Sequence, residues 1–175
     1  MIRLVLISAC AAALAACQQQ PASEPASAPV APTTQITPTA ASDIPPEVVA
    51  VVQAARPGFQ VAEAELKERE GRRYYDVEGT LNGAELEFDL LETSQGWTVV
   101  EIQRDIPWAE APAAVRSAAE TARAGLTPVR VIESTQAADG AVIYELFADG
   151  KPDLPSLEVR QKDGKVDVLK EVWPH

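Results

Sequence analysis

Pairs of acidic residues recur two positions apart in the middle of this chain. The pairs are Glu63 and Glu65, Asp76 and Glu78, and Glu87 and Asp89. Residues two apart in a β-strand point to the same face of the sheet, so each pair would present two carboxylates on one side. Carboxylate oxygens are the ligands that calcium prefers, and they also form charge-assisted hydrogen bonds with Lys and Arg. The pattern therefore predicts a surface for a cation or for a basic partner.

Two turn signals predict how the strands that carry these acids are paired. Asn82-Gly83 is a strong two-residue hairpin signal, and Glu70-Gly71 is a plausible second one. With two-residue loops, Ala64, Val77 and Phe88 form one apolar row, and Leu66, Tyr75 and Leu90 form the next. Alternation then places Glu63, Glu78 and Glu87 in one acidic row of the opposite face, and Glu65, Asp76 and Asp89 in the next.

The acidic face has three open interpretations. Like charges directly opposite each other destabilise a sheet by some tenths of a kcal/mol per pair. Water, salt and the basic residues at the strand ends, which include Lys67 and Arg69, are sufficient to screen such charges. The alternatives are a divalent cation, for which calcium is the one cofactor suggested, and a protein with a basic surface.

Composition argues against most other chemistry. The chain has 175 residues, a single histidine at His175, and only two cysteines, Cys10 and Cys17. This excludes Cys/His zinc sites and histidine-based triads. A net charge of −11 argues against nucleic-acid binding, which needs clustered Lys and Arg. A flat, wet sheet face offers no desolvated pocket for paired-carboxylate hydrolysis, so we expect a protein without enzymatic activity.

Residues 1–16 have the features of a secretory signal. A basic start is followed by an apolar run that is shorter than the roughly 20 residues needed to span a membrane. The run ends in Leu14-Ala15-Ala16-Cys17, which resembles the lipobox of bacterial lipoproteins. That resemblance implies that Cys17 is lipidated and, since Gln18 follows it, that the protein is anchored in the periplasm to the outer membrane. A second match ending at Cys10 has too short an apolar run, and a signal without lipidation is the remaining alternative.

The segment that follows Cys17 predicts a tether. Residues 17–43 are rich in Pro, Ala, Ser, Thr and Gln and contain almost no large apolar side chains. Such a segment cannot bury enough surface to offset its chain entropy, so we expect it to be disordered.

The rest of the chain predicts an α+β fold of two tandem repeats, residues 44–107 and 108–175. Each repeat would have one helix, starting after Pro45 or Pro112, followed by a four-stranded antiparallel meander. We expect strands near 61–69, 73–80, 85–91 and 97–103, and near 129–136, 141–148, 156–162 and 165–172.

Two stretches of the sequence indicate a protein family: Arg73-Tyr74-Tyr75-Asp76-Val77-Glu78 and Leu81-Asn82-Gly83-Ala84-Glu85-Leu86. In these stretches, and in where its helices start and stop, the chain resembles the PepSY-like periplasmic proteins. The resemblance implies a fold related to that of the β-lactamase inhibitory protein, which also has two helix-and-sheet repeats. It further implies a protein-binding, inhibitor-like role toward a periplasmic or envelope protein, without selecting the target. The chain departs from the family's usual turn at residues 92–96.

Overall fold

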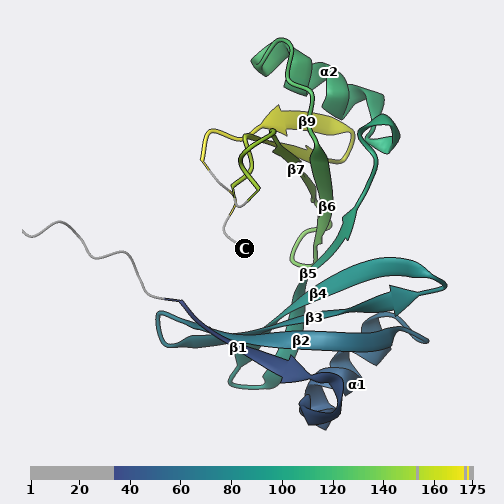
Figure 1. The fold of residues 1–175 in the computed structure, drawn as a ribbon, viewed down its shortest axis with the longest axis vertical. Helices are drawn as coiled ribbons and strands as arrows, with labels where there is room; N and C mark the ends of the chain where they lie inside the picture. Colours follow the sequence, from purple (N-terminus) through teal and green to yellow (C-terminus); the bar gives the residue numbers. More distant parts are fainter. Residues whose placement is uncertain (1–33, 153, 172, 174–175) are drawn as a thin grey trace, which may run out of the picture. The chain divides into compact units, whose positions relative to one another are not determined.

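The structure is a computed structural model that describes residues 34–152, 154–171 and 173 (Figure 1). Within these residues there are two α-helices, α1 (Pro46–Ala55) and α2 (Ala113–Ala122), and two short 3-10 helices, η1 (Ala41–Asp43) and η2 (Trp108–Glu110). The strands are β1 (Gln35–Ala40), β2 (Gln60–Arg69), β3 (Arg72–Leu81), β4 (Ala84–Thr93), β5 (Gly96–Asp105), β6 (Arg130–Gln136), β7 (Val142–Phe147), β8 (Leu157–Lys162) and β9 (Lys165–Val168).

The prediction of two separate helix-and-meander repeats is wrong. All nine described strands form one continuous antiparallel sheet in the order in which they occur in the chain. The connection is β5, whose last residues pair with β6, with Glu101 opposite Gln136 and Asp105 opposite Ile132. Strand β5 is long enough to pair with β4 and then with β6, so the backbone groups of its second edge are also hydrogen-bonded.

Strand β1 is a second difference from the sequence prediction. Residues 35–40 were expected to belong to the disordered tether, but they pair antiparallel with β2, with Thr37 opposite Leu66. An edge strand of this kind is held by backbone hydrogen bonds and needs few apolar side chains. Its residues are almost all exposed, which is why composition did not reveal it.

Tight turns set the register of the central strands. Asn82 and Gly83 have φ values of 54° and 84°, and Glu70 and Gly71 have 54° and 73°. Positive φ at both central residues is the mark of a type I′ hairpin turn, whose twist matches that of the flanking strands. Both loops therefore have the two residues that the sequence predicted, with Leu81 opposite Ala84 and Arg69 opposite Arg72.

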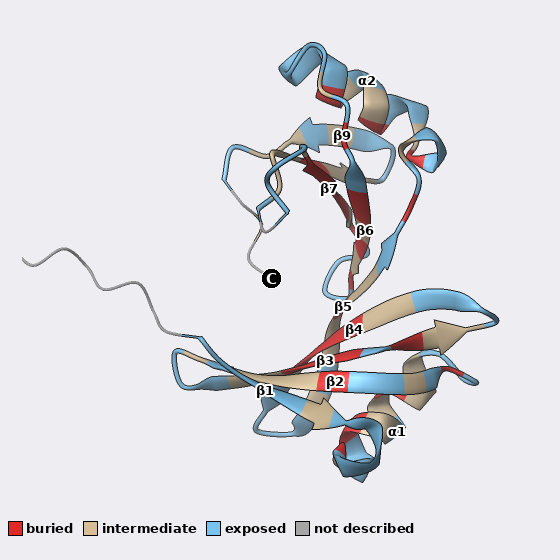
Figure 2. Cartoon of the chain, viewed as in Figure 1, coloured by how far each residue is buried: buried red, intermediate tan, exposed pale blue. Residues whose placement is uncertain are grey.

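Helix α1 covers the apolar face of the first half of the sheet. It begins at a proline, where the missing N–H costs nothing, and Val48 and Val52 on one side of it are fully buried. They pack in a core with Val77, Phe88 and other strand residues. Figure 2 colours the buried residues of β2, β3 and β4 red, and the strand residues of this core are among them.

Helix α2 covers the same face of the continuous sheet. Its buried residues Val115 and Ala119 pack in a second core that includes Val131. Ile102, which packs on the α1 core, lies opposite Thr135, and Val131 precedes Thr135 by four residues. Val131 and Ile102 therefore share a face, and the six carboxylates of the two predicted acidic rows lie on the face that neither helix covers.

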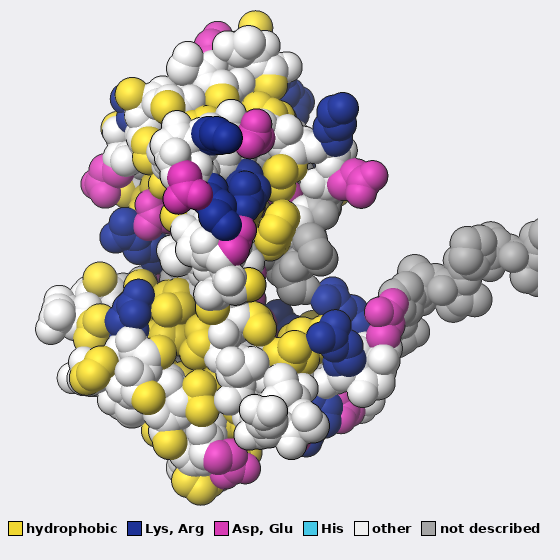
Figure 3. Space-filling model, turned by 180° about the vertical axis from the view of Figure 1, so that it is seen from behind, with side chains coloured by type: hydrophobic (Ala, Val, Ile, Leu, Met, Phe, Trp, Pro, Cys, Tyr) yellow, Lys and Arg dark blue, Asp and Glu magenta, His cyan; other side chains and the backbone are white. Residues whose placement is uncertain are grey.

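The view from behind agrees with this placement. Few Asp or Glu side chains appear on the half that carries α1, where apolar side chains are prominent (Figure 3). In the described part of the chain, neither helix has the length and apolar character that crossing a bilayer requires.

Candidate functional site

The structure confirms the predicted rows of acidic residues. Glu63 lies opposite Glu78 and Glu65 opposite Asp76 across β2 and β3. Across β3 and β4, Asp76 lies opposite Asp89, and Glu78 lies opposite Glu87. The six predicted site residues therefore share one sheet face in two adjacent rows.

The six residues differ in depth, and the expectation of a uniformly wet face is wrong. Glu63 and Glu78 are exposed, and Glu65 and Glu87 are half-buried. Asp76 and Asp89 are only 7% and 8% exposed. Neighbouring side chains cover these two: Lys67 contacts Asp76, and the amide of Gln103 lies on Asp89.

Three carboxylates converge at the buried end of this face. One oxygen from each of Asp76, Glu87 and Asp89 lies within 4.8 Å of the others, so the three residues could hold a metal ion. We call them the carboxylate triad. Glu87 and Asp89 come from β4, and Asp76 comes from β3. Asp76 lies directly opposite Asp89, so the carboxyl groups of the two strands are neighbours.

Lys67 is the cation that contacts the triad in the described structure. Its ammonium forms an ion pair with Asp76, and its side chain is 34% exposed. Burial lowers the pKa of Lys67, but attraction to Asp76, and more weakly to Asp89 and Glu87, outweighs burial and leaves the pKa above its usual value. Lys67 therefore stays charged, and it supplies one positive charge against three carboxyl groups.

The carboxyl groups resist ionisation. Burial, followed by repulsion from Asp76 and Glu78, raises the pKa of Glu87 to about 7. Burial, followed by repulsion from Asp76 and Glu87, raises the pKa of Asp89 well above its ordinary value. Burial also raises the pKa of Asp76, in spite of Lys67. An added positive charge nearby would stabilise the ionised form of each of these carboxyl groups.

A buried polar network extends the site toward β6, and sequence reasoning missed it. Gln103 Nε2 donates hydrogen bonds to Asp89 Oδ2 at 3.2 Å and to Glu101 Oε1 at 2.7 Å. Ser134 Oγ also donates to Glu101, and Gln136 Nε2 donates to Ser134 Oγ at 2.7 Å. Glu101 is only 2% exposed.

A bulge explains why Glu101 was missed. Leu90 lies opposite Val99, so strict alternation would put Glu101 on the helix face with Val99. An extra residue of β5 lies between the Leu90–Val99 pair and the Asp89–Glu101 pair and shifts the register. Glu101 therefore lies opposite Asp89, on the acidic face. The spacing of the acidic residues in the sequence indicated the acidic face, but nothing in it indicated this shift in the register of β5.

Asp89 has one oxygen without a hydrogen-bond partner. Oδ2 accepts from Gln103, whereas Oδ1 is fully buried and accepts no hydrogen bond from any described residue. A buried acceptor in this state costs about 1–3 kcal/mol. Asp89, one of the three residues of the carboxylate triad, therefore has a buried oxygen with no hydrogen-bond partner among the described residues.

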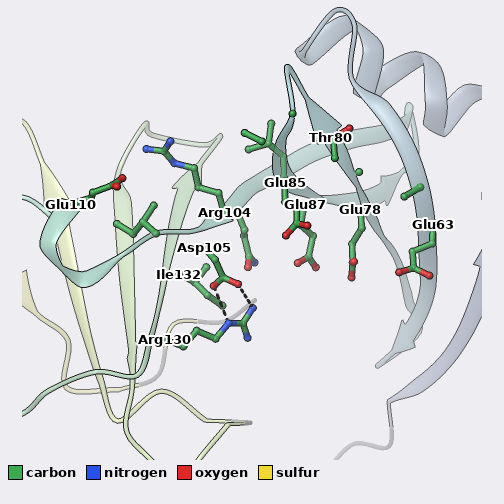
Figure 4. A pocket seen from close by; sticks show the side chains of 17 residues that line it. Glu63, Glu78, Thr80, Glu85, Glu87, Arg104, Asp105, Glu110, Arg130 and Ile132 are labelled. Carbon is green, nitrogen blue, oxygen red and sulfur yellow. Dashed lines mark hydrogen bonds and ion pairs between the residues drawn. The ribbon is translucent and has the colours of Figure 1, made fainter.

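The row of Glu63, Glu78 and Glu87 lines a cleft of about 680 Å³. Figure 4 shows Glu63, Glu78 and Glu87 pointing the same way from three neighbouring strands. Further lining side chains include Glu85, Asp105, Glu110, Arg104, Arg130, Leu86, Ile106 and Ile132. We call this pocket the acidic cleft.

Both arginines of the acidic cleft are ion-paired. Arg130 donates from Nε to Asp105 Oδ1 at 2.9 Å and from Nη2 to Asp105 Oδ2 at 3.2 Å. Arg104 Nε donates to Glu133 Oε1 at 2.7 Å. The charges of both arginines are therefore largely neutralised by these ion pairs, and Glu63, Glu78 and Glu87 keep the cleft negative.

No family model, curated protein or solved structure matches this chain. The resemblance to PepSY-like proteins therefore remains a prediction. The predicted signal segment, residues 1–16, and the lipidation residue Cys17 lie outside the described residues.

Proposed function

We propose that this protein binds a divalent cation, calcium, at the carboxylate triad of Asp76, Glu87 and Asp89. The observation that carries the proposal is that Asp89, one of the three converging carboxylates, has a buried oxygen, Oδ1, without a hydrogen-bond partner among the described residues. A cation there would be coordinated by this oxygen. Its positive charge would also stabilise the ionised carboxylates, which burial destabilises.

The chemistry of the donors favours calcium over a transition metal. All three groups are carboxylates, which are hard oxygen donors, and no histidine or thiol is among them. Calcium takes 6–8 oxygen ligands in flexible geometry, so three carboxylates with water can satisfy it. Binding requires the singly charged Lys67 ammonium to give up some of its contact with Asp76 to a doubly charged ion.

Calorimetric titration of the full chain with calcium chloride tests the proposal. We expect heat of binding for the wild type and its loss in Asp89→Asn, which keeps the side chain's shape but removes its charge. Asp167→Asn is the matched control, because Asp167 is an exposed strand aspartate outside the triad. Absence of heat from the wild type at millimolar calcium would refute the calcium proposal.

A second candidate function is protein binding, favoured by the acidic cleft. In this proposal the protein is a periplasmic lipoprotein, anchored through Cys17 to the outer membrane, that binds an envelope protein with a basic surface without catalysing a reaction. Its support is a concave, negatively charged site of about 680 Å³ on the sheet. Chemical crosslinking in intact envelopes tests it: we expect a crosslinked protein that is lost in Glu63→Gln/Glu78→Gln, and equal yields would contradict it.

A further inference from the structure

We infer that the acidic cleft binds an extended segment of a partner protein in which Lys or Arg residues alternate with other residues. This inference rests on the protein-binding proposal and is independent of calcium. The cleft is distinct from the carboxylate triad, because only Glu87 belongs to both.

The spacing of the glutamates fits such a segment. Glu63, Glu78 and Glu87 come from adjacent strands, so their row spans two strand spacings, about 10 Å. Side chains on one face of an extended peptide recur at about 7 Å. The long stems of Lys and Arg cover the remaining difference, so two alternate basic residues of one segment can reach two carboxylates of the row.

The wall of the cleft also suits Lys and Arg rather than a compact cation. Half-buried Leu86 lines the cleft with the carboxylates, together with Ile106 and Ile132, which are each 8% exposed. Lys and Arg bury their methylene stems against apolar surface while their charged ends stay at polar groups. A bare metal ion or ammonium would gain nothing from these residues.

The cleft already accommodates a guanidinium of this chain. Arg130 lies across from the glutamates in Figure 4 and makes its two hydrogen bonds to Asp105. Its guanidinium carbon also lies 5.5 Å from the centre of the Phe147 ring. Arg130 therefore remains fixed to β6 and Asp105, and Glu63 and Glu78 remain exposed to a partner.

Fluorescence polarisation with labelled peptides tests the inference on the full chain in EDTA. The probe is a short peptide of alternating Lys and Thr, and the comparison peptide has Glu in place of Lys. We expect saturable binding of the Lys peptide alone. Glu63→Gln/Glu78→Gln should weaken it about fivefold to tenfold, because each exposed ion pair contributes up to about 1 kcal/mol.

The matched control is Asp167→Asn/Glu171→Gln, which removes two exposed acidic charges that do not line the cleft. It should leave the affinity within about twofold, since distant exposed charges are screened. Failure of the Lys peptide to bind, equal binding of the Glu peptide, or equal weakening by both double variants would overturn the inference. If the peptide fails while envelope crosslinking still depends on Glu63 and Glu78, the protein-binding proposal stands and only the extended basic segment is refuted.

Discussion

Replacing Glu87 with glutamine should make the protein less sensitive to pH. The pKa of Glu87 is about 7 in the folded protein, against 4.5 for the ordinary group. Because the folded-state pKa is raised, the stability associated with this group is fully present below about pH 4.5. It is lost as the pH rises to about 7, where the buried carboxyl ionises.

The size of the effect follows from the two pKa values. At 1.36 kcal/mol for a tenfold change in proton affinity, the difference between 4.5 and about 7 corresponds to about 3 kcal/mol. Glu87 is partly exposed, and solvent screening reduces this to on the order of 2 kcal/mol. Glu87→Gln should therefore match the wild type near pH 4.5 and exceed its free energy of unfolding by about 2 kcal/mol at pH 8.

Urea denaturation followed by tryptophan fluorescence, in EDTA at several pH values, measures this difference. Glu85→Gln is the control, because Glu85 lies on the same face of β4 but is exposed. It should change the free energy of unfolding by less than about 0.5 kcal/mol throughout. If the wild type and Glu87→Gln lose stability in parallel between pH 4.5 and 8, burial does not act on this carboxyl, and the electrostatic account of the site is wrong.

Three further substitutions test other parts of the structure. Lys67→Met should lower the free energy of unfolding by about 2 kcal/mol in EDTA, because Asp76 loses its contacting ammonium; calcium should restore the loss, and a variant as stable as the wild type in EDTA would contradict this. Gly79→Ala should lower it by more than about 3 kcal/mol, since a Cβ would lie 2.1 Å from the Gln60 carbonyl oxygen; a thermal midpoint near that of the wild type would contradict the close approach of β2 and β3. Cys17→Ser should abolish labelling by an alkyne fatty acid, and persistent labelling would exclude Cys17 as the lipidated residue.

The sequence was informative about the acidic rows because local rules determine them. Two tight turns at Glu70-Gly71 and Asn82-Gly83 set the pairing, and alternation along the strands then placed Glu63, Glu78 and Glu87 side by side. The expected central strands also lie within a few residues of those observed. None of these inferences required knowledge of distant parts of the chain.

The sequence was uninformative where long-range pairing decides the structure. Nothing in the composition of β1 or in the end of β5 indicates which strand lies beside it, so the single sheet was not predicted. The bulge near Asp89 moves Glu101 to the acidic face, and alternation alone gives the opposite result. The burial of Asp76 likewise depends on contacts with Lys67 from another strand.

Depth, rather than charge count, separates the two candidate sites on the acidic face. Exposed Glu63 and Glu78 are screened by water, so they cost little when unpaired, and a partner would gain mainly specificity from them. Asp89 is buried, and its charge can be offset only by a proton, by Lys67 or by an added cation. The raised pKa of Asp89 means that Lys67 alone does not offset it, so proton and cation compete for the same group. Calcium binding at the triad should therefore weaken as the pH falls.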